Sequence, residues 1–244
     1  MQVKGIKKHK GKIIAAAVIL CVLVVAYIWG GNYAVSDISY NFASPSPTPC
    51  QREGSSEGVF EGSKSYSEQL GMVFDKETGK DRYLTDPVPE GKPIPVEPQD
   101  AVITDTAHTC ILSVRCDTIL NNMKYLDKEK VELVPEDGVI FPATEVTFYE
   151  GESVFNILRR EMKKAGIHME FVNTPMYNSV YIEGINNLYE FDVGELSGWM
   201  YKVNGWFPNY GASRYQLKAG DVVEWVYTCN LGRDVGGYYA MGEE

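Results

Sequence analysis

The distribution of apolar and polar side chains divides the chain into regions with different patterns. Residues 13–29 form a run of seventeen residues without a charge, which is about the shortest run that crosses the hydrocarbon core of a membrane. Residues 30–109 are rich in Ser, Pro and Gly and have no apolar periodicity, a composition typical of a disordered linker. In residues 110–236, short runs alternate between apolar and polar side chains, which indicates β-strands of a folded domain. The last residues, 237–244, are expected to form a flexible tail.

The folded region is predicted to combine several strands with one main helix. Residues 110–116 and 145–149 alternate as strands, and further strand-like runs follow in the second half of the region. Between them, residues 154–165 carry apolar side chains at helical spacing, with Ser153 as the N-cap and Gly166 after the last turn. We therefore expect an α+β domain in which a small mixed sheet packs on this helix.

The apolar run is predicted to be a single transmembrane anchor. Five lysines and no acidic residue precede it, so residues 1–12 are expected in the cytoplasm and everything after the anchor outside the cell. The run ends in Tyr27, Ile28 and Trp29, an aromatic interface pattern, instead of the small residues of a cleavage site. A cleaved signal peptide is the alternative. The anchored form has the lipid bilayer as its first partner.

The charge distribution argues against nucleic acid as a partner. The formal net charge is −10. The part after the anchor has a more negative net charge than this, because five of the lysines lie before the anchor. Nucleic-acid binding depends on clustered Lys and Arg that neutralise phosphates, and no basic stripe follows the anchor. The three histidines and five cysteines are not spaced as a metal site, so no metal site is predicted.

The most informative motif lies between residues 197 and 228. It contains W-x-Y-x-V-N-G from Trp199 to Gly205, then G-x-S and a Tyr, and finally G-D-x-V-E-W ending at Trp225. The Asn-Gly pair is typical of a tight hairpin turn. This pattern resembles the transcobalamin-like C-terminal β-grasp domain, a domain of unknown function in bacterial surface proteins. The resemblance covers about residues 110–236 and is strongest over the last forty of them.

The resemblance implies a fold, a ligand class and a disulfide. A β-grasp fold has a mixed sheet packed on one main helix, with its first and last strands side by side and parallel. Cys116 and Cys229 would then lie at neighbouring strand ends, within reach of a disulfide bond. Three buried free thiols, with Cys110 as the third, are the alternative. In vertebrate cobalamin carriers the corresponding domain forms one side of a cobalamin-binding cleft, so the implied ligand is cobalamin or another corrinoid.

Two loops provide the candidate ligand-binding residues. The loop that follows the Asn-Gly turn carries large side chains that have no strand face on which to bury, namely Trp206, Phe207, Asn209 and Tyr210. Such side chains can stack on a planar ligand or, with equal weight, cover the edge of the core. Tyr177 and Asn178 lie in another loop, where they are expected either to contact the ligand or to form the turn itself.

No pairing of residues indicates catalysis. His108 and His168 have neither a nucleophile nor a metal-spaced partner in the sequence, so we expect the protein not to be an enzyme and to need no cofactor. We expect a ligand-binding module at the cell surface. The alternative is a structural or adhesive module that binds a surface protein or a wall polysaccharide. A concave pocket favours the first function, and a flat aromatic patch favours the second.

Overall fold

The computed structural model describes residues 62–237, which belong to one compact unit. The predicted cytoplasmic tail, the predicted anchor and the part of the predicted linker before residue 62 lie outside the described residues, as does the chain from residue 238 onward. Within residues 62–237, no helix has both the length and the hydropathy needed to cross a membrane.

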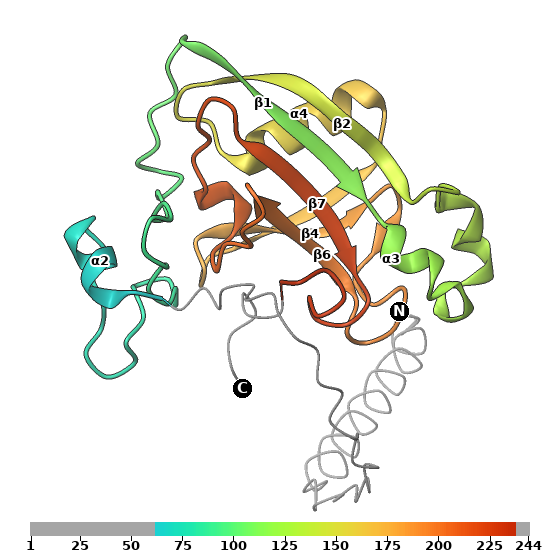
Figure 1. The fold of residues 1–244 in the computed structure, drawn as a ribbon, viewed down its shortest axis with the longest axis horizontal. Coiled ribbons are helices and arrows are strands. Elements are labelled where there is room, and N and C mark those ends of the chain that lie inside the picture. Colours follow the sequence, from blue (N-terminus) through green and yellow to red (C-terminus); the bar gives the residue numbers. More distant parts are fainter. Residues whose placement is uncertain (1–61, 238–244) are drawn as a thin grey trace, which may run out of the picture. The chain divides into compact units, whose positions relative to one another are not determined.

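A mixed four-stranded sheet forms the centre of the domain (Figure 1). Its strands are β1 (Ala107–Arg115), β2 (Val139–Tyr149), β6 (Gly198–Val203) and β7 (Val222–Thr228), in the spatial order β2-β1-β7-β6. β1 and β7 are parallel, whereas the other neighbouring pairs are antiparallel. The α+β class predicted from the sequence is confirmed, and the first and last strands of the sheet are neighbours.

The main helix, α4 (Val154–Ala165), lies behind β1 and β2 in Figure 1. It begins where the sequence predicts, because the Ser153 hydroxyl accepts from the Asn156 amide and the Asn156 side chain accepts from the Ser153 amide. It ends at Gly166, whose φ of 68° is the left-handed conformation that closes many helices. Both ends of the helix are therefore encoded locally.

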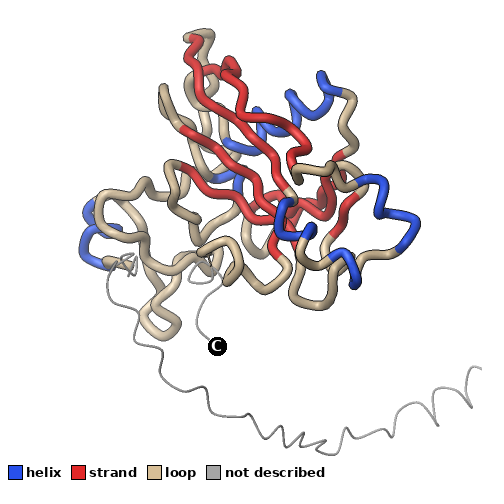
Figure 2. Tube along the Cα trace, turned by 45° about the vertical axis from the view of Figure 1, so that its right-hand side comes forward, coloured by secondary structure: helices blue, strands red, loops and turns tan. Residues whose placement is uncertain are grey.

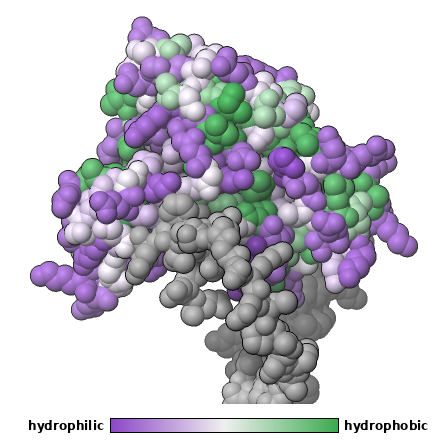
Figure 3. All heavy atoms as spheres, viewed as in Figure 1, coloured by the Kyte–Doolittle hydropathy of each residue, from purple (hydrophilic) through white to green (hydrophobic). Residues whose placement is uncertain are grey.

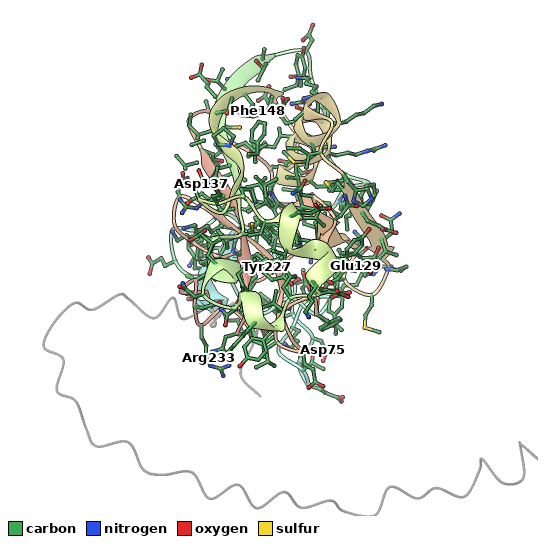
Figure 4. All side chains as sticks on the ribbon, turned by 90° about the vertical axis from the view of Figure 1, so that its right-hand side faces the viewer. Asp75, Glu129, Asp137, Phe148, Tyr227 and Arg233 are labelled. Carbon is green, nitrogen blue, oxygen red and sulfur yellow. The ribbon has the colours of Figure 1, made fainter. Side chains whose placement is uncertain are left out.

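The core lies between α4 and the sheet. Alternation along the strands turns side chains such as Leu112 and Val223 onto the buried face, where they meet Ile157 and Leu158 of the helix. Figure 4 shows Phe148 and Tyr227 inside the domain, and both are fully or almost fully buried. Burial of this kind stabilises the fold by roughly 1.5–3 kcal/mol for each large apolar side chain.

A second, antiparallel sheet packs on the same helix. It consists of β3 (Met169–Thr174), β4 (Ser179–Ile185) and β5 (Leu188–Tyr189). The Phe171 ring of β3 meets the Phe155 ring of α4 edge-on, with 4.9 Å between their centroids. This contact fixes the first turn of α4 against the β3–β4 hairpin, which is the part of the domain where the cavity described below is found.

Short helices complete the described structure. They are α2 (Lys64–Gln69), α3 (Asp117–Leu120) and the 3₁₀ turns Met123–Tyr125, Lys128–Leu133 and Ala212–Arg214.

The expectation of a disordered linker is wrong for residues 62–106, which pack against the domain. Apart from α2, Figure 2 shows this segment as loop, yet the Val88 side chain has an exposed fraction of 0%. The Val88 amide donates to the Ser67 hydroxyl over 2.9 Å, and the Thr104 amide donates to the Glu150 carbonyl over 3.0 Å. The prolines of this segment predict extended backbone, but they do not decide whether that backbone packs.

A buried arginine binds this segment to the domain. Arg214 is 1% exposed and donates through Nη2 to Asp81 over 2.9 Å and to Glu97 over 2.6 Å. Its Nη1 donates to the Thr85 hydroxyl over 2.6 Å, and its carbonyl accepts from the Val96 amide over 2.9 Å. Residues 81–97 therefore surround one guanidinium group from several sides. We call this set of contacts the Arg214 clamp.

The predicted disulfide is not present, and Cys110, Cys116 and Cys229 are free thiols. The carboxyl ends of β1 and β7 do bring Cys116 and Cys229 into one region, but the Cys229 thiol donates to the Thr118 hydroxyl, 3.7 Å away. Burial raises the pKa of Cys116 to about 12, so this thiol stays protonated and unreactive near neutral pH.

Replacing the arginine tests the clamp. Arg214→Ala is expected to lower the free energy of unfolding by about 3–5 kcal/mol, because it leaves the carboxylates of Asp81 and Glu97 without their buried counter-charge. The measurement is urea unfolding of residues 56–244. Arg233→Ala is the control, since Arg233 is exposed at the lower edge of the domain in Figure 4 and is expected to change stability by less than about 0.5 kcal/mol. Equal midpoints for both variants would show that the clamp does not stabilise the domain.

Candidate functional site

The aromatic loop that the sequence singles out is buried. Trp206 is 2% exposed and Tyr210 is 6% exposed. The Tyr210 carbonyl accepts from the Tyr201 hydroxyl over 2.7 Å, and the Tyr210 hydroxyl donates to the Pro93 carbonyl over 2.7 Å. The Tyr210 ring also stacks on that of Tyr215, with centroids 6.1 Å apart. These side chains cover the edge of the core, so the expectation that they face a ligand does not fit the structure.

The packed segment accounts for this burial. Asn209 donates through Nδ2 to the Asp86 carbonyl over 3.1 Å, and Lys92 places its Nζ 5.5 Å from the centroid of the Trp206 ring. Phe207 is buried as well, and Gly237 approaches its ring closely. In Figure 1 the segment, coloured cyan to green, runs beside the orange chain that follows β6. The residues expected to be a linker therefore occupy the place expected for a ligand.

The structure gives the aromatic loop a testable role in stability. Trp206→Ala is expected to lower the free energy of unfolding by about 3–5 kcal/mol, as truncation of a large buried aromatic side chain usually does. Tyr125→Ala serves as the control, because the Tyr125 ring is mostly exposed and is expected to contribute less than about 0.5 kcal/mol. Thermal and urea unfolding report both values. A Trp206→Ala variant as stable as the control would contradict the core role of the loop and would again favour a ligand-contacting role.

The described residues contain a cavity of about 460 Å³ at a different place. One wall is formed by the chain from Val96 to Ile103, and another by the first turn of α4 with Phe155. The β3–β4 hairpin supplies a third wall, and Ser213 and Gln216 complete the lining. A cavity of this volume lies within the usual range for small-molecule sites, which is about 300–1,000 Å³. It is therefore the candidate functional site.

Glu97 positions two of these walls. Its carboxylate accepts from Arg214 over 2.6 Å and from the Nδ2 atom of Asn178 over 2.5 Å. Asn178 also donates to the Gln99 side chain over 3.0 Å and has a φ of 47°, a left-handed conformation that asparagine tolerates in turns. The hairpin tip and residues 96–103 are thus held together through the Arg214 clamp.

Several polar groups of the cavity are already fixed by internal hydrogen bonds. Ser153 and Asn156 bond to each other at the start of α4. The Thr174 hydroxyl donates to the Ser179 carbonyl over 2.7 Å, and the hydroxyls of Ser179 and Ser213 lie 2.9 Å apart. These bonds give the walls a defined shape before any ligand binds, which lowers the entropy cost of binding.

Only one of the six predicted ligand-binding residues lines the cavity. Asn178 does so through the hairpin tip, whereas Tyr177 is 51% exposed beside it and the four residues of the aromatic loop lie elsewhere. Sequence reasoning missed Asn173 and Gln216, which look like ordinary polar positions in and near strands, and it missed residues 96–103 because their composition is that of a linker. The polar turn around Asn178 was the one usable signal.

Neither a metal-binding cluster nor a large apolar patch is seen in the part of the molecule that the structure and Figure 3 show. Within residues 62–237, no group of three or more His, Cys, Asp or Glu side chains is arranged to hold a metal ion. The face drawn in Figure 3 is mostly polar, with apolar residues in small separate patches. The cavity is therefore the feature of the described residues that calls for a functional explanation.

Comparison with known proteins places part of this fold in a family. Residues 151–229, from the turn before α4 to the end of β7, match the model of a domain of unknown function, DUF4430. The match includes the motif at residues 197–228 and confirms that this motif belongs to a domain of unknown function. The strands β1 and β2 and the packed segment precede the matched residues. No curated protein matches the chain.

Two solved structures are similar over about half of the chain. One is haptocorrin in complex with Cbi, with 17% identity and a TM-score of 0.37, over 52% of this chain and 26% of that chain. The other is described as "a putative metal binding protein" from Ruminococcus gnavus ATCC 29149, with 14% identity and a TM-score of 0.29, over 50% of this chain and 96% of that chain. At these scores neither similarity identifies a ligand for this protein.

Proposed function

We propose that the protein is a membrane-anchored, extracellular ligand-binding module that holds a small ligand in the cavity beside Asn178. The observation that supports this function most directly is the cavity itself, whose walls are joined by Glu97 and whose volume is about 460 Å³. The β-grasp arrangement implied by the resemblance is consistent with the parallel pairing of β1 and β7. We propose no catalytic role.

Cobalamin or another corrinoid is the ligand that the resemblance implies. Cobalamin consists of a corrin macrocycle with a nucleotide arm and is larger than this cavity, so only part of it would enter. The rest would need a second surface, as in the two-sided cleft of the vertebrate carriers. Corrinoids are therefore one ligand class to be tested.

One observation favours the alternative of an adhesive module. Four exposed apolar side chains lie in the two segments that border the cavity, namely Val102, Ile103, Met176 and Tyr177. Exposed apolar side chains that gather near a cavity mark interaction surfaces in many proteins. A surface protein or a wall polymer that covers this rim is the second candidate partner.

Filling the cavity separates the two functions. Ala101→Trp places a large ring in the cavity, and Ala219→Trp places the same ring on an exposed turn that is not part of the lining. Calorimetry of the full-length protein against cobinamide, cobalamin and a small-molecule panel is expected to detect a ligand that Ala101→Trp weakens at least about tenfold and Ala219→Trp leaves unchanged. Equal affinities in the two variants, or a panel without any ligand, would contradict the proposal.

The proposed location is tested on intact cells. Five lysines precede the predicted anchor and none follows it until Lys64, so the domain is expected outside the cell. Protease added to intact cells is expected to remove an epitope tag placed at the carboxyl terminus. An amino-terminal tag should be cut only after lysis. Protection of the carboxyl-terminal tag until lysis would reverse the proposed orientation.

A further inference from the structure

The lining of the cavity carries no ionisable side chain. Of its sixteen residues, eight have polar neutral side chains, and the other eight are Gly, Ala, Val, Pro, Ile or Phe. The carboxylate of Glu97, which lies between the lining residues Val96 and Pro98, is already bonded to Arg214 and Asn178. That of Glu152, between Gly151 and Ser153, is paired with Arg160. A charged ligand would lose its hydration without gaining a counter-charge, which is strongly unfavourable. The lining therefore favours an uncharged ligand.

The same lining disfavours a purely apolar ligand. The side-chain amides of Asn173 and Gln216 make no hydrogen bond to any other residue within 62–237. An apolar ligand would separate these amides from water and leave them unpaired, at a cost of roughly 1–3 kcal/mol for each group. The ligand must therefore offer hydrogen-bonding groups to these two amides.

An extended peptide satisfies amides but does not suit the side of the cavity that β4 forms. Peptides that add to a sheet need a free strand edge at the binding site. Two pairs of strand residues line the cavity, and in each pair a residue of β3 is opposite one of β4 in the antiparallel ladder. The pairs are Asn173 with Val180 and Thr174 with Ser179. The Val180 amide points out of this ladder and donates to the Ser213 hydroxyl over 3.1 Å, so this main-chain donor is not available to a peptide.

A carbohydrate ring combines the required properties. Each amide side chain has two N–H donors and an acceptor oxygen, which match hydroxyl groups that donate and accept in turn. Asn173, Gln216 and the free Oδ1 of Asn178 provide such groups on the hairpin and on the chain beside it. The lining also contains apolar surface from Phe155 and Val180, on which the C–H face of a sugar ring can pack. The Phe155 ring is held in place by its edge-on contact with Phe171.

We propose that the cavity binds an uncharged carbohydrate ring, either as a free sugar or as a unit of a surface polysaccharide. This inference rests on the proposed ligand-binding function and specifies the chemical class of the ligand. Asn173 and Gln216 are its main hydrogen-bonding residues. Because the walls carry no charge, the site discriminates against amino sugars and uronic acids.

The test compares neutral and charged sugars on the full-length protein. Calorimetry and saturation-transfer NMR are run with glucose, galactose, mannose and N-acetylglucosamine, with their β-linked oligosaccharides, and with glucosamine and glucuronate. At least one neutral sugar is expected to bind, and its charged counterpart is expected to bind at least about tenfold more weakly. An affinity that rises with oligosaccharide length identifies a polymer as the source, and an affinity that does not rise identifies a free sugar.

Matched variants assign the site. Asn173→Ala and Gln216→Ala are each expected to weaken binding about fivefold or more, whereas Asn230→Ala and Gln69→Ala, which remove exposed amides elsewhere, leave it unchanged. Thermal midpoints show whether each variant remains folded, and the sugar-charge comparison needs no variant at all. Tighter binding of glucosamine or glucuronate than of every neutral sugar would overturn the inference.

The outcomes also separate this inference from the proposed function. If no sugar binds but Ala101→Trp abolishes binding of a corrinoid or of another small molecule, the cavity is a ligand site and the carbohydrate class is wrong. If no ligand of any class depends on Ala101, both the inference and the proposed function fail.

Discussion

The ion pairs of Arg214 constrain the rest of the structure. A guanidinium group with an exposed fraction of 1% needs compensation, because an unpaired charge inside a protein costs several kcal/mol. Its partners Asp81, Thr85 and Glu97 all lie upstream of residues 151–229. The region that matches the family model therefore includes the buried Arg214 but none of these three partners. Residues 81–97 are consequently part of the same folded domain.

The same contacts connect the fold to the cavity. Glu97 accepts from Arg214 and from Asn178, so one carboxylate joins the clamp to the tip of the β3–β4 hairpin. The next residues, from Pro98 to Ile103, form a wall of the cavity. The cavity thus depends on three levels of structure, which are a local turn at Asn178, a long-range ion pair at Arg214 and the packing of Phe155 on Phe171.

Local patterns in the sequence predicted the elements that local physics determines. Helix α4 has its cap at Ser153 and its end at Gly166, and the alternating strands follow from a period of two. The cavity could not be predicted in this way, because its walls come from segments far apart in the chain. A pair such as Asp81 and Arg214 has no local signature. Asn173 and Gln216 are polar positions that become important only because they line the cavity together with residues from distant segments.

The proline-rich composition of residues 86–100 predicts a disordered linker, and this prediction is wrong for a physical reason. Proline has no amide N–H, and extended proline-rich backbone makes no internal hydrogen bonds. Its carbonyl groups are therefore free, either for water, as in a linker, or for side-chain donors. Here the Pro93 carbonyl accepts from the Tyr210 hydroxyl, the Lys92 carbonyl from the Tyr66 hydroxyl, and the Asp86 carbonyl from Asn209.

The two candidate loops of the sequence analysis therefore have different roles in the structure. A row of free carbonyls beside an aromatic loop is a good surface for tyrosine and asparagine side chains, since it satisfies their polar ends while their rings pack. The loop at Trp206 therefore becomes part of the core under the proline-rich segment. The turn at Asn178, which is less conspicuous in the sequence, instead borders the cavity, because its amide reaches the carboxylate that Arg214 holds in place.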